Sequence, residues 1–227
     1  MPVFNEEKFV ARAVRLVDRA SVGNLVKEII VVDDGSVDKT GKIIKKIKRK
    51  FGSRLKVVFL KKNHGKGFAI KKALQKVTGE VVVIQDADLE YNPEEIKLLL
   101  QPILDGYADV VYGSRFMSNK PHRVLFFWHM VGNKLLTLLS NMFTNLNLTD
   151  METGYKMFRT KIIKKIDLKE ERFGFEPEVT AKVAKLNCRV YEVGISYQGR
   201  KYEDGKKINW QDGLWTLGCI FKYNLFS

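Results

Sequence analysis

Several residue types are scarce in this chain, and each scarcity excludes a class of protein. With only Cys188 and Cys219 among 227 residues, neither a disulfide framework nor a cysteine zinc site can form. The three histidines, His64, His122 and His129, are too scattered to make a metal site. No apolar run reaches the roughly 20 residues that cross a bilayer. We therefore expect a globular protein with reduced thiols, as is usual in the cytoplasm.

Acidic residues are fewer than basic ones. The chain has 40 Lys and Arg against 26 Asp and Glu, which gives a formal net charge of +14. A basic surface attracts nucleic acid, anionic lipid or phosphorylated substrates. A solvated, lysine-rich helix face is an alternative that suffices for residues 42–50. No RNP box, zinc-finger spacing or basic-zipper heptad is present, so we expect no nucleic-acid partner. Lipid and phosphate ligands remain the candidates that the charge favours.

Short β-branched runs alternate with helix-spaced apolar residues along the first half of the chain. The end of a strand, most of which is missing, is expected at residues 2–6, followed by a helix over about 6–20. Further strands are predicted within residues 27–36, 55–60, 81–85 and 108–115. This alternation is typical of a doubly wound α/β sheet with flanking helices. The carboxyl ends of its strands form the edge where ligands bind in open α/β sheets.

The stretch 81–90, VVVIQDADLE, is the feature around which the rest of the chain is organised. Its apolar run predicts a strand buried on both faces, which ends in Asp86 and Asp88. Carboxylates two residues apart on a strand point the same way. Two hard oxygen ligands facing one point suit Mg²⁺ or Mn²⁺ held together with a diphosphate. The alternative is a polar turn in which both acids are solvated.

The second half of the chain has a different character. A long helix over 122–148 is apolar nearly all round, which indicates either a buried helix or one that lies on a membrane or a partner. An amphipathic helix rich in aromatic residues is expected over 210–226, with the same two alternatives. Between them we predict strands at 154–159 and 189–197 and a helix at 173–186. The polar loop 197–209 is a candidate lid.

Six motifs, in this order, carry a resemblance to a known family: PVFNE, IIVVDDGSVDKT, NHGKGFA, QDADLE, VVYGSR and DMETGYKMFR. Together they resemble the family-two glycosyltransferases with the GT-A fold, and within them the polyprenyl-phosphate sugar synthases. The resemblance implies a Rossmann-like, mostly parallel sheet in one domain spanning 1–227. Its nucleotide-sugar-binding half would be 1–115, and its acceptor-binding half 116–227.

The resemblance also assigns roles in donor binding. Asp86 and Asp88 match the metal-binding acids, and Glu90 stands where the mannose synthases commonly carry Gln, as a third expected ligand of Mg²⁺ or Mn²⁺. Phe4 departs from the tyrosine that the family usually has. Nucleotide binding is expected of residues in three loops, namely Pro2, Phe4, Glu6, Asp33, Asp34, Gly65 and Gly67, together with Asp86.

The roles implied for the acceptor half are carried mainly by basic residues. Arg115 matches an arginine that grips phosphate, and Arg123 precedes the position of a second arginine that has no clear match. Arg200 and Lys207 match basic residues of the acceptor loop. Asp150 is added to Asp86, Asp88 and Arg115 as a catalytic candidate.

The implied activity is inverting transfer of a hexose from GDP-mannose or UDP-glucose to a dolichyl or undecaprenyl phosphate, as in dolichyl-phosphate mannosyltransferases. A phosphate acceptor is already anionic and needs cationic guides, whereas a hydroxyl acceptor needs a base such as Asp150, Glu176 or Glu178. We expect a peripheral protein at the inner, cytoplasmic face of the membrane, with a membrane-embedded partner subunit as a further expectation. The alternatives are a transferase acting on a sugar or protein hydroxyl, and a nucleotide-binding protein without catalysis.

Overall fold

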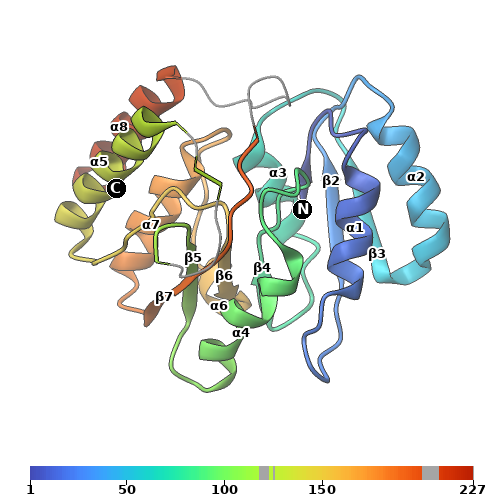
Figure 1. Cartoon of the computed structure of the whole chain (residues 1–227), viewed down its shortest axis with the longest axis horizontal. Helices are drawn as coiled ribbons and strands as arrows, with labels where there is room; N and C mark the ends of the chain where they lie inside the picture. The colour runs from blue at the N-terminus through green and yellow to red at the C-terminus, as the bar shows by residue number, and fades with distance from the viewer. Residues whose placement is uncertain (118–122, 125, 201–209, 227) are drawn as a thin grey trace.

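The computed structural model describes residues 1–117, 123–124, 126–200 and 210–226 (Figure 1). Its strands are β1 Pro2–Val3, β2 Ile29–Asp33, β3 Leu55–Phe59, β4 Val81–Val83, β5 Val110–Ser114, β6 Lys156–Arg159 and β7 Val190–Gly194. Its α-helices are α1 Val10–Arg19, α2 Thr40–Phe51, α3 Lys66–Leu74, α4 Ile96–Leu104, α5 Phe127–Thr144, α6 Thr160–Ile163, α7 Phe175–Lys185 and α8 Trp210–Leu225, with 3₁₀ helices η1 Gly52–Arg54 and η2 Pro93–Glu95. The α/β class and the amphipathic C-terminal helix are confirmed.

The strands form two hydrogen-bonded sheets in the part of the chain that the structure describes. The first has the order β1-β2-β3 and is parallel throughout, and the second has the order β4-β6-β5-β7. Within the second sheet β6 runs antiparallel to both of its neighbours, while β5 and β7 are parallel. The sheet is therefore mostly parallel, as expected, with one reversed strand that the apolar pattern does not reveal.

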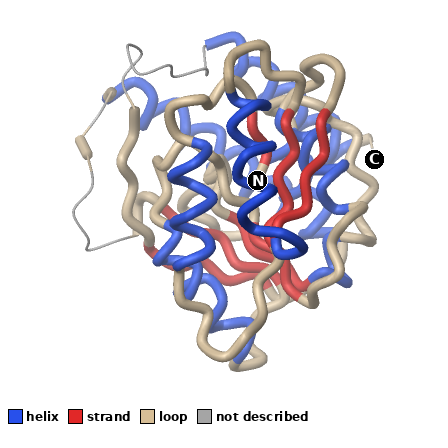
Figure 2. The backbone as a smooth tube through the Cα atoms, turned by 90° about the vertical axis from the view of Figure 1, so that its right-hand side faces the viewer, coloured by secondary structure: helices blue, strands red, loops and turns tan. Residues whose placement is uncertain are grey.

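Helices cover both faces of the strands, which lie between them in Figure 2. The alternation along β5 shows the two sides, because Val111 belongs to an apolar cluster with residues of α1, α2 and α4, whereas Val110 and Tyr112 belong to a second cluster with residues of α3, α6 and α7. A strand with apolar side chains on both faces is what a β-branched run favours. These two apolar clusters, one on each face of the sheet, fix the strands and thereby the starting points of the loops at the strand ends.

β4 departs from the sequence expectation in length and in burial. The strand ends at Val83 rather than Gln85, and its three valines are only half-buried. The prediction of a strand buried on both faces is wrong here because a cavity of about 400 Å³ lies beside Val81 and Val83. Asp86 and Asp88 therefore sit in the turn after the strand, so their directions are set by the turn and by their partners rather than by strand alternation.

α5 and α8 pack against each other at one end of the molecule (Figure 1). Phe143 of α5 and Phe221 of α8 meet edge to face, with ring centroids 5.3 Å apart. Only Thr137 and Ser140 of α5 are buried, so the buried-helix alternative is wrong for this element. Within the described residues, no helix combines the length and apolarity that a bilayer crossing needs.

Candidate active site

The carboxyl ends of several strands meet at one edge of the structure, where most of the predicted site residues lie. The loop after β3 is held there because Asp34 accepts hydrogen bonds from the backbone N–H groups of His64 and Gly65, at 3.0 and 2.7 Å. The next residue, Lys66, contacts Asp86 after β4. The ends of β2 and β4 are thereby joined through the start of α3.

Arg200, which follows β7, gathers the acids of two other loops. Its guanidinium lies 3.2 Å from Glu6 and 3.3 Å from Asp88, and its backbone N–H donates to Glu90 at 2.7 Å. Tyr197 donates its hydroxyl to the other oxygen of Glu90 at 2.9 Å. One arginine from the segment after β7 therefore contacts three carboxylates from the loops after β1 and β4, in a largely buried setting.

The electrostatic environment of Asp88 is unusual for an aspartate. Burial, reinforced by the negative charges of Asp86 and Glu90, raises the pKa of Asp88 to about 7. Arg200 opposes this rise, because an adjacent cation favours the charged carboxylate. The pKa of Asp88 thus lies near neutral pH, and a cation placed beside the carboxyl group would favour its ionised form.

Asp86 is held by a lysine that was not among the predicted site residues. Lys66 Nζ lies 3.0 Å from Asp86 and 3.0 Å from Glu176 of α7. Burial alone lowers the pKa of Lys66, but the carboxylates of Asp86 and Glu176 outweigh it and raise that pKa well above its ordinary value. A side chain at position 154 would collide with Asp86 and Lys66, so Gly154 leaves room for this ion pair.

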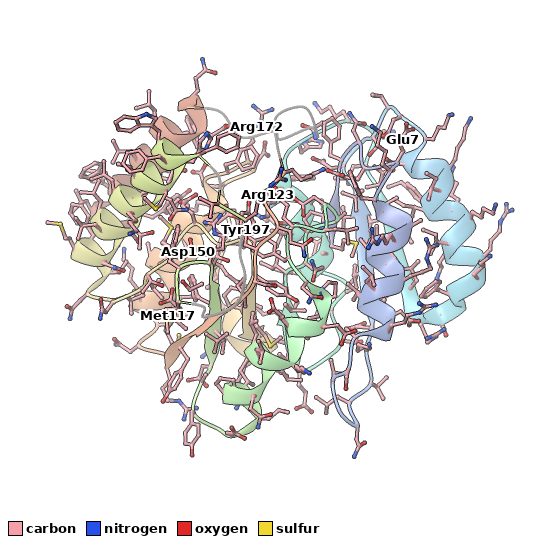
Figure 3. All side chains as sticks on the ribbon, in the orientation of Figure 1. Glu7, Met117, Arg123, Asp150, Arg172 and Tyr197 are labelled. Carbon is pink, nitrogen blue, oxygen red and sulfur yellow. The ribbon has the colours of Figure 1, made fainter. Side chains whose placement is uncertain are left out.

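Arg115 and Asp150, two predicted catalytic residues, bind each other. The guanidinium of Arg115 donates to both carboxylate oxygens of Asp150, at 2.6 and 2.7 Å, and its backbone N–H donates at 3.0 Å. The Arg115 guanidinium also lies 5.2 Å from the ring centroid of Tyr197. Tyr197 thereby links this pair to Glu90 and Arg200, and Figure 3 shows Tyr197 and Asp150 near the centre of the molecule.

The two glycines of the NHGKGFA motif have a packing role in the structure. Gly65 has a φ of +111°, and a side chain at Gly65 or Gly67 would collide with the backbone of residues 170–171. The N–H of Phe68 donates to the carbonyl of Glu171 at 3.1 Å. These contacts bring the first turn of α3 close to the segment before α7, so the chain's own backbone explains both glycines. Their expected approach to a nucleotide stays a prediction.

The remaining predicted residues lie around this edge or outside the described residues. Asp33 accepts from the N–H of Ser36 at 3.0 Å and shapes the turn after β2, while Pro2 and Phe4 precede Glu6 in the β1 loop. Arg123 donates to the carbonyl of Gly199 at 2.8 Å, which places it beside the segment that leads to Arg200. Lys207, and most of the loop 197–209, lie outside the described residues.

The acids fit a divalent cation only in part. Among the described residues, no group of three or more acids, histidines or cysteines is arranged to hold a metal ion on its own. Glu90, the expected third ligand, has both oxygens bonded to Tyr197 and to the Arg200 N–H. Asp88 also has a partner on each oxygen, the Glu90 N–H at 3.1 Å and Arg200 at 3.3 Å, whereas Asp86 has Lys66 on one oxygen. Asp86 and Asp88 are the two expected ligands that leave the same turn, and two carboxylates completed by substrate phosphates are the usual set for Mg²⁺. The donor set suits an ion that arrives with a diphosphate.

Sequence reasoning missed Lys66, Tyr197 and Gly154, and gave Glu152 no role. Burial, reinforced by the Glu176 carboxylate, raises the pKa of Glu152 to about 8, and its Oε1 has no hydrogen-bond partner among the described residues. Lys66 sits inside NHGKGFA, and Glu152 and Gly154 sit inside DMETGYKMFR, so their motifs carried a signal. Tyr197 had none, because only the folded chain brings it to the site.

The family model described as Glycosyl transferase family 2 matches residues 1–167 of the chain. A relative from Edwardsiella ictaluri, an undecaprenyl-phosphate 4-deoxy-4-formamido-L-arabinose transferase, is 28% identical over 208 residues, covering 91% of this chain and 61% of the relative. A dodecaprenyl-phosphate galacturonate synthase from Rhizobium johnstonii is 28% identical over 203 residues, covering 89% of this chain and 59% of the relative. The chain spans about three fifths of the length of both relatives.

Among solved structures, the fold is similar to that of glucosyl-3-phosphoglycerate synthase from Mycobacterium tuberculosis in complex with Mn²⁺, UDP and phosphoglyceric acid. The TM-score is 0.75 at 17% identity, and the match covers 100% of this chain and 77% of that one. At this identity the likeness shows the GT-A type of fold and nothing of the substrate.

Proposed function

Because the chain belongs to glycosyl transferase family 2, we propose that it moves a hexose, mannose or glucose, from a nucleotide sugar to a polyprenyl phosphate, with inversion at the anomeric carbon. The observation that carries this proposal is the meeting of donor-half acids with acceptor-half arginines at one edge, where Arg200 contacts Glu6 and Asp88. Two relatives are named for transfer to or synthesis on undecaprenyl or dodecaprenyl phosphate, with different sugars. The lipid phosphate is thus the feature that the names of the two relatives share.

On the donor side, Asp86 and Asp88 are the residues that would hold Mg²⁺ or Mn²⁺. Such an ion neutralises charge on a diphosphate leaving group. Lys66 fixes the position of Asp86, since it lies 3.0 Å from both Asp86 and Glu176. Residues 2–6 and the turns held by Asp33 and Asp34 surround the position proposed for the nucleotide, GDP or UDP.

On the acceptor side, the described acids fit a phosphate acceptor better than a hydroxyl. Each predicted base already has cationic or N–H partners: Asp150 binds Arg115, Glu176 binds Lys66, and Glu178 binds Lys182 and two backbone N–H groups. A phosphate monoester is already anionic at neutral pH and needs no base. Arg200, with Arg123 beside its segment and Lys207 further along, supplies cations to position it.

A hydroxyl acceptor is the second candidate, and one observation favours it. Glu152 Oε1 is buried without a hydrogen-bond partner among the described residues. A carboxylate of this kind can accept a proton from a hydroxyl. Since the pKa of Glu152 is about 8, it would act as a base mainly above that pH. Glu152→Gln would then abolish transfer to hydroxyl acceptors and leave transfer to phosphate acceptors intact.

Membrane attachment is proposed for the outer face of α5 and α8, at the inner, cytoplasmic side of the membrane. Trp128 is 78% exposed and Met142 71% exposed on α5, and Trp215 and Phe226 are exposed at α8. Aromatic side chains of this kind favour the headgroup region of a bilayer. The same face could bind a membrane-embedded partner subunit, and binding to protein-free vesicles separates the two.

The test incubates the protein and Mn²⁺ with labelled GDP-mannose or UDP-glucose and either a polyprenyl phosphate or the matching polyprenol. Label in the organic phase only with the phosphate supports the proposal. Label that stays in the aqueous phase with both donors and both lipids rules out mannose or glucose transfer to a lipid phosphate. Transfer to the polyprenol, or to a free sugar, points instead to a hydroxyl acceptor.

A further inference from the structure

A buried acid, Glu170, lies in the 168–174 segment, within the connection from α6 to α7. Burial alone would raise the pKa of Glu170, but hydrogen bonds from Lys222 and Tyr223 outweigh it and lower that pKa. The carboxylate is therefore ionised at neutral pH inside the protein. A buried charge is costly unless specific partners hold it, so the partners of Glu170 indicate what it does.

Three side chains of the C-terminal helix α8 bind the Glu170 carboxylate. The Tyr223 hydroxyl donates to it at 2.6 Å, the Lys222 ammonium group at 2.8 Å and the Trp215 indole N–H at 3.2 Å. Hydrogen bonds to an ionised acceptor are about twice as strong as those between neutral groups. One carboxylate thus anchors α8 to the 168–174 segment.

Glycines bring this segment into close contact with the helices on both of its sides. A side chain at Gly174 would collide with Cys219 of α8. On the side of α3, side chains at Gly65 and Gly67 would collide with the carbonyl oxygens of residues 171 and 170. Close-packed contacts of this kind transmit a displacement, because no free space is left to absorb it.

The first turn of α3 carries the lysine that holds Asp86. α3 begins at Lys66, whose Nζ lies 3.0 Å from Asp86. In the same turn, the N–H of Phe68 donates to the carbonyl of Glu171 at 3.1 Å. Figure 1 shows α8 at one end of the molecule and α3 near its middle. Continuous contacts therefore lead from α8, through the 168–174 segment, to the acid proposed to bind the metal ion.

We propose that Glu170 is a positioning residue of the donor site, which ties the docking of α8 to the position of Lys66 and Asp86. α8 holds Glu170, the backbone at 170–171 holds the first turn of α3, and Lys66 in that turn holds Asp86. The inference rests on the proposed function, since that function assigns Asp86 to the metal ion and the donor diphosphate. It makes α8 a part of the donor site as well as a candidate membrane contact.

The test measures the dissociation constant for GDP and UDP in the presence of Mn²⁺, by calorimetric titration, in variants of Glu170. Glu170→Gln keeps an acceptor for Trp215 and Tyr223 but loses the ion pair with Lys222. We expect it to weaken nucleotide binding at least about fivefold, at the lower end of the usual coupling between two sites. Glu170→Ala, which removes all three bonds to α8, should weaken binding further.

Trp215→Phe keeps the test decisive if the Glu170 variants do not fold. Trp215 is 58% exposed, so the substitution should preserve the fold while it removes one of the three hydrogen bonds to Glu170. We expect nucleotide binding to weaken about two- to threefold, because a single hydrogen bond contributes modestly.

The matched control is Phe221→Leu, which loosens α8 at its contact with Phe143 of α5 and leaves the partners of Glu170 in place. It should lower the Tm without changing the dissociation constant for the nucleotide. A loss of affinity as large as that of Glu170→Gln would show that any loosening of α8 suffices, and it would overturn the role given to Glu170.

Amide exchange at Phe68 supplies a readout that needs no nucleotide, because this N–H donates to the Glu171 carbonyl. Glu170→Gln should speed exchange there at least about tenfold, whereas Phe221→Leu should leave it unchanged. If the unaltered protein binds neither nucleotide, the proposed function fails and the exchange at Phe68 alone decides the inference. Unchanged exchange at Phe68 in Glu170→Gln would overturn it, and so would faster exchange with an unchanged dissociation constant.

Discussion

Arg115 at the end of β5 and Asp150 before β6 form a two-pronged ion pair, with N–O distances of 2.6 and 2.7 Å, and the Asp150 side chain is fully buried. Both residues were predicted to be catalytic, and each has the other as its main partner. The pair holds the loop after β5 against the DMETGYKMFR segment. Its first role in the structure is to fix the loop after β5 at the site edge.

Removing one member of this pair should destabilise the protein strongly. Asp150→Ala leaves the Arg115 guanidinium buried without its partner, which typically costs about 3–5 kcal/mol. Urea denaturation measures the change. The matched control is Asp18→Ala, since Asp18 pairs with Arg54, whose side chain is 62% exposed, and exposed pairs contribute about 0–1 kcal/mol. A cost below about 1 kcal/mol for Asp150→Ala would show that the pair is not structural.

Lys66→Met should lower the free energy of unfolding, because two buried acids lose their shared cation. The substitution leaves Asp86 and Glu176 facing each other without the lysine that lies 3.0 Å from both. We expect a loss of about 2–4 kcal/mol, as for other broken buried pairs. The double variant Lys66→Met/Glu176→Gln should recover part of this loss, because one of the two carboxylates is then neutral. No recovery in the double variant would contradict the electrostatic explanation.

The Met1 amine should give stability a specific pH dependence. Its pKa falls from 8.0 to about 5 on folding, so between pH 5 and 8 the unfolded chain binds a proton that the folded chain does not. Stability from this group therefore rises with pH across that window, by roughly 4 kcal/mol at most. Urea denaturation at pH 5.5, 6.5 and 7.5 measures it.

Asp88 and Glu152 act in the opposite sense, because their pKa values are raised to about 7 and about 8 and their contribution falls as pH rises. Acetylation of the Met1 amine removes its titratable charge and leaves these acids unchanged. The difference between the pH profiles of the unmodified and the acetylated protein therefore isolates the contribution of the Met1 amine to stability. Identical profiles would mean that the Met1 amine is solvated.

The exposed aromatic face should bind anionic membranes. Trp128→Ser with Met142→Ser removes two large apolar side chains that are mostly exposed, so folding should be unaffected. Co-sedimentation with protein-free vesicles containing anionic lipid should weaken at least about tenfold, given roughly 25 cal/mol per Å² of buried apolar area. Val37→Ser, at a position 88% exposed away from α5 and α8, is the control. Equal vesicle binding by all variants would contradict membrane attachment through this face.

Much of the fold could be read from the sequence, because strand and helix periods are local properties. The order of strands and helices and the acids at the strand ends were predicted. The reversed direction of β6 was not, since an apolar run has the same pattern in either direction. The half-buried state of Val81–Val83 was missed for a similar reason, because valines that line a cavity have the same sequence pattern as valines in a closed sheet.

The place of three predicted site residues in the fold follows from the sequence, whereas their pairing does not. Asp86, Asp88 and Arg115 lie at the expected edge. The partners of these residues could not be predicted from the sequence. Asp88 contacts Arg200, which also contacts Glu6 across 194 residues of the chain, and the partner of Asp86 is Lys66, in a motif noted for its glycines. Tertiary packing determines these contacts. It also places Gly65 and Gly67 against the backbone of residues 170–171.

The central claim is that the acids at this edge bind a divalent ion together with a sugar nucleotide's diphosphate. Calorimetric titration with GDP and UDP, with Mn²⁺ and with EDTA, tests it most directly in the unaltered protein and in Asp88→Asn. The account predicts that one nucleotide binds only with Mn²⁺, and that Asp88→Asn weakens binding at least about tenfold while leaving the Tm without ligand near its original value. Undiminished binding by Asp88→Asn, or binding that EDTA does not change, would contradict it.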